Sequence, residues 1–120
     1  MSDRQVTIRM PKELLAKWLA GLRDGEYKQG IGRLRDSKGG YCCLGVLEVV
    51  AGELENDGYA ALPSTQWMER HQCTFLSQGG MPDTTPYLPS VDSTASEAND
   101  DSKFTFDQIA TAIEDCAEGF

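Results

Sequence analysis

The chain lacks any long apolar run. No stretch of its 120 residues approaches the ~20 apolar residues that a membrane-spanning helix needs, and no membrane partner is expected. The first residues, MSDRQVTIRMPKELL, also lack the uninterrupted apolar region of a secretory signal. We therefore expect a cytoplasmic protein whose four cysteines stay reduced.

Motifs of the common catalytic sites are missing too. The chain has no Walker loop, no dinucleotide-binding glycine fingerprint, no HExxH and no GxSxG, so we assign no catalytic residues and expect no cofactor. Zinc sites usually use pairs of Cys or His about two to four residues apart, and only His71 and Cys73 form such a pair. We therefore predict no metal ligands. A metal-stabilised interaction module remains the second alternative for the function.

Basic residues are scarce in the second part of the chain. Residues 1–40 hold nine Lys/Arg and five Asp/Glu, a net charge of +4, whereas residues 41–120 hold two and fourteen, a net charge of −12. So much negative charge repels nucleic acid and attracts basic surfaces. We therefore expect a partner with a basic surface and no direct binding to nucleic acid.

The apolar content of 40% is that of a globular chain, and the length fits one domain over residues 1–120. Apolar periodicity and stop signals predict helices at 10–25, 42–52, 64–72 and 104–116. The last is the best defined, because Thr105 and Gln108 have the spacing of a capping box.

The remaining segments have weaker signals. Residues 1–10 are expected to form a flexible N-terminal arm, and residues 77–103 a long irregular loop with one short strand near 86–91. Residues 27–35 are expected to form either an extended segment, such as one strand of a hairpin that turns at 36–40, or an irregular arm. The predicted fold is α+β: a small, mainly helical domain with a short hairpin or small sheet and a capped C-terminal helix.

The adjacent cysteines Cys42 and Cys43 raise the question of reactivity. Neighbouring cysteines do not readily form a disulfide with each other. Cys43 and Cys116 fit packing positions, whereas Cys42 would face away from Cys43 toward a cleft beside Tyr41. A nucleophilic Cys42 or Cys43 would need a base, for which His71 or Asp100 is available.

Polar and basic residues precede the cysteines in a glycine-interrupted segment. Tyr27, Gln29 and Arg33, together with Lys28 and Arg35, form either a solvated edge or a basic and aromatic arm that can bind a phosphate or an acidic partner. Asn99 and Asp100 lie just before the last helix, where such side chains often form turns.

Several motifs occur in a fixed order: WLAGLRDGEYKQGIGRL, YCCLGVLEVVAG, LPSTQWM and EANDDSKFTFDQIATAIED. Over residues 18–115 this order resembles a family of small proteins encoded in tailed-phage and prophage genomes. The chain departs from the family pattern at Glu48, where a cysteine is frequent, and at Ala98, where a leucine is frequent. The resemblance implies a phage accessory protein in the cytoplasm of the host cell, and it implies no particular activity.

The polar positions of this pattern suggest a binding site. If Tyr27, Gln29, Asn99 and Asp100 converge near Cys42, they form a small polar pocket suited to a nucleotide-like ligand. The candidate binding residues are Tyr27, Gln29, Arg33, Cys42, Asn99 and Asp100.

These observations favour a non-enzymatic binding protein over a catalyst. It would bind and occlude a host or defence component that has a basic surface, or it would sequester a small nucleotide-like ligand. The alternative from another class is a small cysteine-dependent enzyme that uses Cys42 or Cys43.

Overall fold

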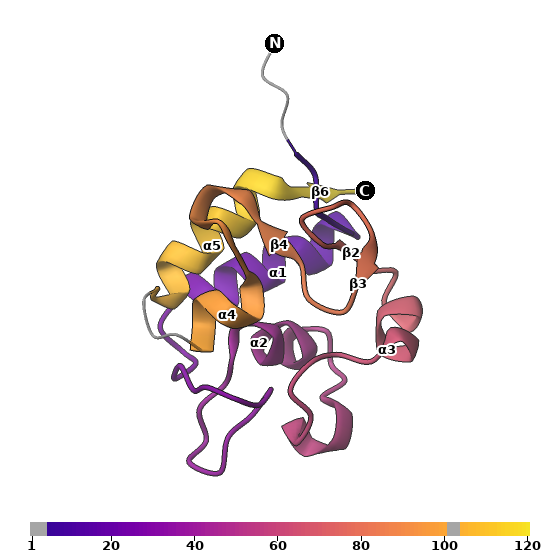
Figure 1. Cartoon of the computed structure of the whole chain (residues 1–120). Coiled ribbons are helices and arrows are strands. Elements are labelled where there is room, and N and C mark those ends of the chain that lie inside the picture. Colours follow the sequence, from indigo (N-terminus) through magenta and orange to yellow (C-terminus); the bar gives the residue numbers. More distant parts are fainter. Residues whose placement is uncertain (1–4, 101–103) are drawn as a thin grey trace.

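Five α-helices dominate the part of the chain described by the computed structural model, residues 5–100 and 104–120 (Figure 1). They are α1 (Lys12–Arg23), α2 (Cys43–Val50), α3 (Thr65–Arg70), α4 (Ala95–Asp100) and α5 (Phe106–Cys116). Helix α1 packs against α2 on one side and α5 on the other. With two small sheets, these helices confirm the predicted α+β class.

Helix starts follow the local signals in the sequence. The Oγ1 atom of Thr105 accepts a hydrogen bond from the Gln108 N–H at 3.2 Å, and the Gln108 side chain accepts one from the Thr105 N–H at 2.9 Å. The predicted capping box of α5 is therefore confirmed. At α3, the Ser64 hydroxyl caps the helix by accepting the Trp67 N–H.

A four-stranded sheet joins the two ends of the described chain. Strand β1 (Ile8–Met10) lies between β2 (Thr74–Leu76), which is antiparallel to it, and β6 (Ala117–Gly119), which is parallel; β3 (Pro82–Asp83) is the edge next to β2. The flexible arm predicted over residues 1–10 is thus wrong for residues 8–10, because Ile8 and Met10 are fully buried. Residues 1–4 of that prediction lie outside the described ranges.

The irregular loop predicted for residues 77–103 contains short regular elements instead. Strand β3 is followed by β4 (Tyr87–Leu88), the 3-10 turn η2 (Pro89–Val91), β5 (Ser93–Thr94) and α4. Strand β4 matches the strand expected near 86–91. Each element is too short to show a period, and buried residues such as Leu88 and Ala95 fix them to the core. Residues 101–103 of this prediction lie outside the described ranges.

Residues 27–41 connect α1 to α2 without regular strands. We call this segment the arm from here on, and it is distinct from the N-terminal arm predicted over residues 1–10. The Gly30 N–H donates to the Tyr41 carbonyl at 2.7 Å, and the Asp36 N–H donates to the Gly40 carbonyl at 2.8 Å. The chain does turn at 36–40 as predicted, but its pairing is limited to isolated bridges of Tyr41 with Gln29 and Arg35. Of the two alternatives, the segment is therefore the irregular arm and not a strand of a hairpin.

The core lies between α1, α2 and α5. The indole N–H of Trp18 donates to the Cys43 carbonyl at 2.8 Å, which ties α1 to the first turn of α2. Cys43 and Cys116 are fully buried, as predicted for packing residues. Within the described ranges, no helix combines the length and the apolar character needed to cross a bilayer.

Candidate functional site

Asn99 of α4 is the centre of the contacts that fasten the arm. Its buried Oδ1 accepts hydrogen bonds from the Gln29 amide at 3.1 Å and from the Cys43 N–H at 3.2 Å. Its amide donates to the Gly30 carbonyl at 2.8 Å. These bonds use both ends of the Asn99 side chain, so its role is to position the arm against α2 and α4.

Asp100 and Gln29 complete this arm junction, which we define as Gln29, Asn99 and Asp100. The Gly32 N–H donates to Asp100 Oδ1 at 3.0 Å, and the Gln29 amide also donates to the Phe104 carbonyl at 3.0 Å. The predicted convergence of these three residues is real. Their polar groups, however, form hydrogen bonds with the protein's own backbone. The junction therefore positions the arm and does not form a ligand pocket.

The other two members of the expected polar pocket lie elsewhere. Cys42 is 4% exposed, and its sulfur accepts the Gly45 N–H at 3.3 Å as the N-cap of α2. It does not face a cleft, because the side chain is buried and its sulfur caps the first turn of α2. Tyr27 packs edge-on against Tyr41 and lines a separate hollow of about 300 Å³ beside α1.

The thiols lack the surroundings of a nucleophile. Burial raises the pKa of Cys42 to about 11 and that of Cys43 well above its ordinary value. His71 was a candidate base for these thiols. Its imidazole lies over the Trp67 ring, with the Nε2 atom 2.9 Å from Glu53 Oε1. Among the described residues, no three His, Cys, Asp or Glu side chains are grouped as a metal site would require.

The arm presents two arginines in a hollow of about 430 Å³, hereafter the arginine–tyrosine hollow. Its lining residues are Arg33, Arg35, Asp36, Ser37, Gly39, Asn56, Asp57 and Tyr59. The Arg33 guanidinium carbon lies 4.3 Å from the centre of the Tyr59 ring, and that of Arg35 lies 5.9 Å from the centre of the Tyr41 ring.

These two arginines differ from the others in the described ranges. Arg9, Arg23 and Arg70 pair with Glu118, Glu114 and Glu53, respectively. In the same part of the chain, neither Arg33 nor Arg35 forms a salt bridge with a carboxylate. A guanidinium stacked on an aromatic ring keeps its in-plane N–H donors available, and these donors match a phosphate or carboxylate.

The hollow depends on a close approach between the arm and η1 (Glu55–Gly58). The Leu34 N–H donates to the Ala60 carbonyl at 2.8 Å, and the Arg35 N–H donates to the Gly58 carbonyl at 2.9 Å. Gly58 has a φ of 84°, and a Cβ atom there would lie 2.3 Å from the Arg35 Cβ. Only glycine fits this position, which brings Tyr59 next to Arg33.

Tyr59 lines the hollow and was not among the candidate binding residues of the sequence analysis. It follows an Asn-Asp-Gly turn, in which Asn56 and Asp57 both adopt positive φ, at 48° and 54°. Such backbone is uncommon outside glycine and concentrates at functional sites. In the sequence, this Asn-Asp-Gly turn is the one signal that could have indicated the pairing of Tyr59 with Arg33, because the turn brings the chain back to the arm.

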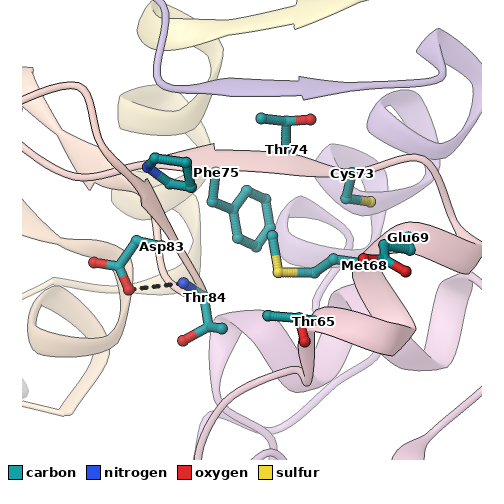
Figure 2. Close-up of a pocket in the computed structure, with 9 residues that line it drawn as sticks. Thr65, Met68, Glu69, Cys73, Thr74, Phe75, Asp83 and Thr84 are labelled. Carbon is teal, nitrogen blue, oxygen red and sulfur yellow. Dashed lines mark hydrogen bonds between the residues drawn. The ribbon is translucent and has the colours of Figure 1, made fainter.

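A second hollow, of about 400 Å³, lies between α3, β2 and β3 (Figure 2). We call it the acidic-rimmed hollow. It is lined by Thr65, Met68, Glu69, Cys73, Thr74, Phe75, Pro82, Asp83 and Thr84. No sequence pattern groups these residues, because they come from three separate segments.

Comparison with protein families gives one match. Residues 10–117 match the model of a family described as a domain of unknown function, DUF8296. No curated protein and no solved structure matches the chain.

Proposed function

The chain belongs to this family of unknown function, and we propose that it is a non-enzymatic, phage-derived protein that sequesters a small nucleotide-like ligand. The ligand would bind in the arginine–tyrosine hollow, in the cytoplasm of the host cell. One observation carries the proposal: the Arg33 and Arg35 guanidinium groups lie over tyrosine rings, 4.3 Å and 5.9 Å from the ring centres, and form no salt bridge with a carboxylate among the described residues.

The lining of the hollow suits a flat group joined to a phosphate. Two guanidinium groups provide donors for phosphate oxygens. The ring of Tyr59, which is 69% exposed, offers an aromatic surface for a base. A volume of about 430 Å³ is within the range of small-molecule sites.

The same lining favours a ligand of low charge. The Lys38 and Gly40 N–H groups each donate to Asp36 at 2.8 Å, and these bonds lower the pKa of the Asp36 carboxyl. Asp36 therefore stays ionised, and Asp57 adds a second carboxylate to the lining. Both carboxylates repel extra negative charge, so a monophosphate fits better than a triphosphate.

Binding rather than catalysis is supported by the state of the thiols. A cysteine nucleophile reacts as its thiolate, whereas burial raises the pKa of Cys42 and Cys43. The competing cysteine-dependent enzyme would need one of these groups to ionise near neutral pH. It would also need a base, whereas the imidazole of His71 is hydrogen-bonded to the Glu53 carboxylate.

Calorimetric titration with nucleoside 5′-monophosphates tests the proposal. We expect saturable binding to the full chain, weakened about tenfold or more by Arg33→Gln/Arg35→Gln because charge-assisted hydrogen bonds are lost. The matched control Lys12→Gln/Lys17→Gln removes the same charge from α1 and should change affinity by less than about twofold. The absence of nucleotide binding, or equal losses in the two double variants, would contradict the proposal.

A second candidate function is occlusion of a host or defence protein that has a basic surface. The net charge of −12 over residues 41–120 favours it, since complementary charge accelerates association. A tagged full-length chain should then retain a specific host protein at low salt and release it at high salt. Capture that does not depend on salt would count against this version.

A further inference from the structure

The acidic-rimmed hollow has an apolar floor. Figure 2 shows the Phe75 ring and the Met68 side chain turned toward each other, with Cys73 to the right of the Phe75 ring. Met68 is 7% exposed and Phe75 is 1% exposed. Burial also raises the pKa of the Cys73 thiol to about 12, so this sulfur is an uncharged part of the floor. Such a floor accepts aliphatic groups and offers nothing to an anion.

The rim carries negative charge from two elements. Glu69 comes from α3 and Asp83 from β3, and Figure 2 places them at opposite sides of the hollow. The nine lining residues include no lysine or arginine. Within the described ranges, neither Glu69 nor Asp83 forms a salt bridge, whereas Glu53, Glu114 and Glu118 are paired with arginines.

We propose that this hollow binds a lysine or arginine side chain from a basic segment of a partner protein. The aliphatic stem would lie on Met68 and Phe75, and the cationic head would reach Glu69 or Asp83. Lysine and arginine combine these two parts, because their stems pack on apolar surface while their charged ends stay at the rim. This inference rests on the partner-binding version of the proposed function and does not involve the arginine–tyrosine hollow.

Threonines in the lining of the hollow offer further hydrogen-bond acceptors to such a side chain. Thr65, Thr74 and Thr84 line the hollow, and their hydroxyls can accept hydrogen bonds from an ammonium or guanidinium group. The Thr84 N–H donates to Asp83 Oδ1 at 2.7 Å, as Figure 2 shows, which holds that carboxylate at the rim.

Fluorescence anisotropy with a designed peptide tests this assignment on the full chain. The probe is fluorescein-labelled Gly-Leu-Arg-Val-Lys-Leu-Gly, and its neutral control carries citrulline for arginine and norleucine for lysine. We expect the basic probe to bind about tenfold or more tightly than the control. Glu69→Gln/Asp83→Asn should remove this difference, and Glu26→Gln/Asp107→Asn, which deletes two exposed carboxylates elsewhere, should preserve it.

Three outcomes would overturn the assignment. They are no binding of the basic probe, equal binding of the two peptides, and equal losses in the rim variant and its matched control. Equal binding would mean that the hollow takes a neutral apolar side chain instead. Arg33→Gln/Arg35→Gln should leave peptide binding unchanged, so failure of nucleotide binding and failure of this inference are distinguishable.

Discussion

The backbone of Leu34 passes directly over Gly45 in α2. A Cβ atom on Gly45 would lie 1.8 Å from the Leu34 carbonyl oxygen. That oxygen also accepts the Cys42 N–H at 3.2 Å, so the contact sets the arm against the start of α2. The glycine in the CCLGVL motif is thus required by the approach of the arm.

This contact predicts an unusual result for Gly45→Ala. Alanine normally stabilises a helix interior relative to glycine by about 0.5–1 kcal/mol. Here the clash with Leu34 should instead lower the free energy of unfolding by about 2–3 kcal/mol. Urea denaturation measures this change. Gly79→Ala is the control, since Gly79 has open space around its Cβ position, and a stable Gly45→Ala protein would contradict this packing.

Asn99 allows a test of the arm junction. Asn99→Ala leaves the Gly30 carbonyl and the Cys43 N–H without their bonds to Asn99, so we expect a loss of about 2–4 kcal/mol in stability. Asn99→Asp keeps an acceptor but cannot donate to Gly30, and it should also destabilise. The exposed Gln78→Ala is the control for chemical denaturation, and equal stability of Asn99→Ala and Gln78→Ala would exclude the proposed role.

The burial of Glu48 predicts that the free energy of unfolding depends on pH. Its Oε1 accepts the Glu55 N–H at 2.7 Å, and its buried Oε2 has no hydrogen-bond partner among the described residues. Burial raises the pKa of this carboxyl from 4.5 to about 7. The folded state therefore binds the proton more tightly than the unfolded chain does, and the resulting stabilisation is lost as the pH rises from about 4.5 to about 7.

Glu48→Gln removes this titration. The variant should match the natural chain at low pH and exceed its free energy of unfolding by about 3 kcal/mol above neutral pH. Thermal or urea denaturation as a function of pH measures the difference, with Glu26→Gln as an exposed control. A constant difference across the pH range would rule out titration of Glu48 as the cause.

The thiols should be slow to alkylate in the folded protein. Burial raises the pKa of Cys42 to about 11 and that of Cys73 to about 12, and Cys43 and Cys116 are fully buried. Iodoacetamide labelling near neutral pH, read by mass spectrometry, should therefore proceed at the rate of local or global unfolding. One cysteine that reacts rapidly below the ordinary thiol pKa of ~8.5 would instead favour the cysteine-dependent enzyme.

The helices could be predicted because their signals are local. Thr105 and Gln108 lie within one turn of each other, and the stripe of Ile109, Ile113 and Cys116 repeats at helical spacing. The sheet could not be predicted in the same way. Strands β1 and β6 have three residues each and pair from opposite ends of the described chain, so neither alternation nor a turn identifies them.

The candidate site was only partly visible in the sequence for a related reason. Arg33 was expected to bind a ligand, and it lines the arginine–tyrosine hollow. Gln29, Asn99 and Asp100 were candidates for a polar pocket near Cys42, but they bond to the backbone that positions the arm. Polar residue types show that a group needs a partner, whereas only the fold decides whether that partner is a ligand or the protein.

The most direct test of the central claim is a nuclear magnetic resonance titration of the ¹⁵N-labelled full chain. We predict that adenosine 5′-monophosphate causes saturable shifts in the Arg33 and Arg35 side-chain N–H signals and in the Tyr59 amide. Adenosine, which lacks the phosphate, should cause weaker shifts at the same places. No response to the monophosphate, an equal response to adenosine, or shifts centred on the acidic-rimmed hollow would contradict the claim.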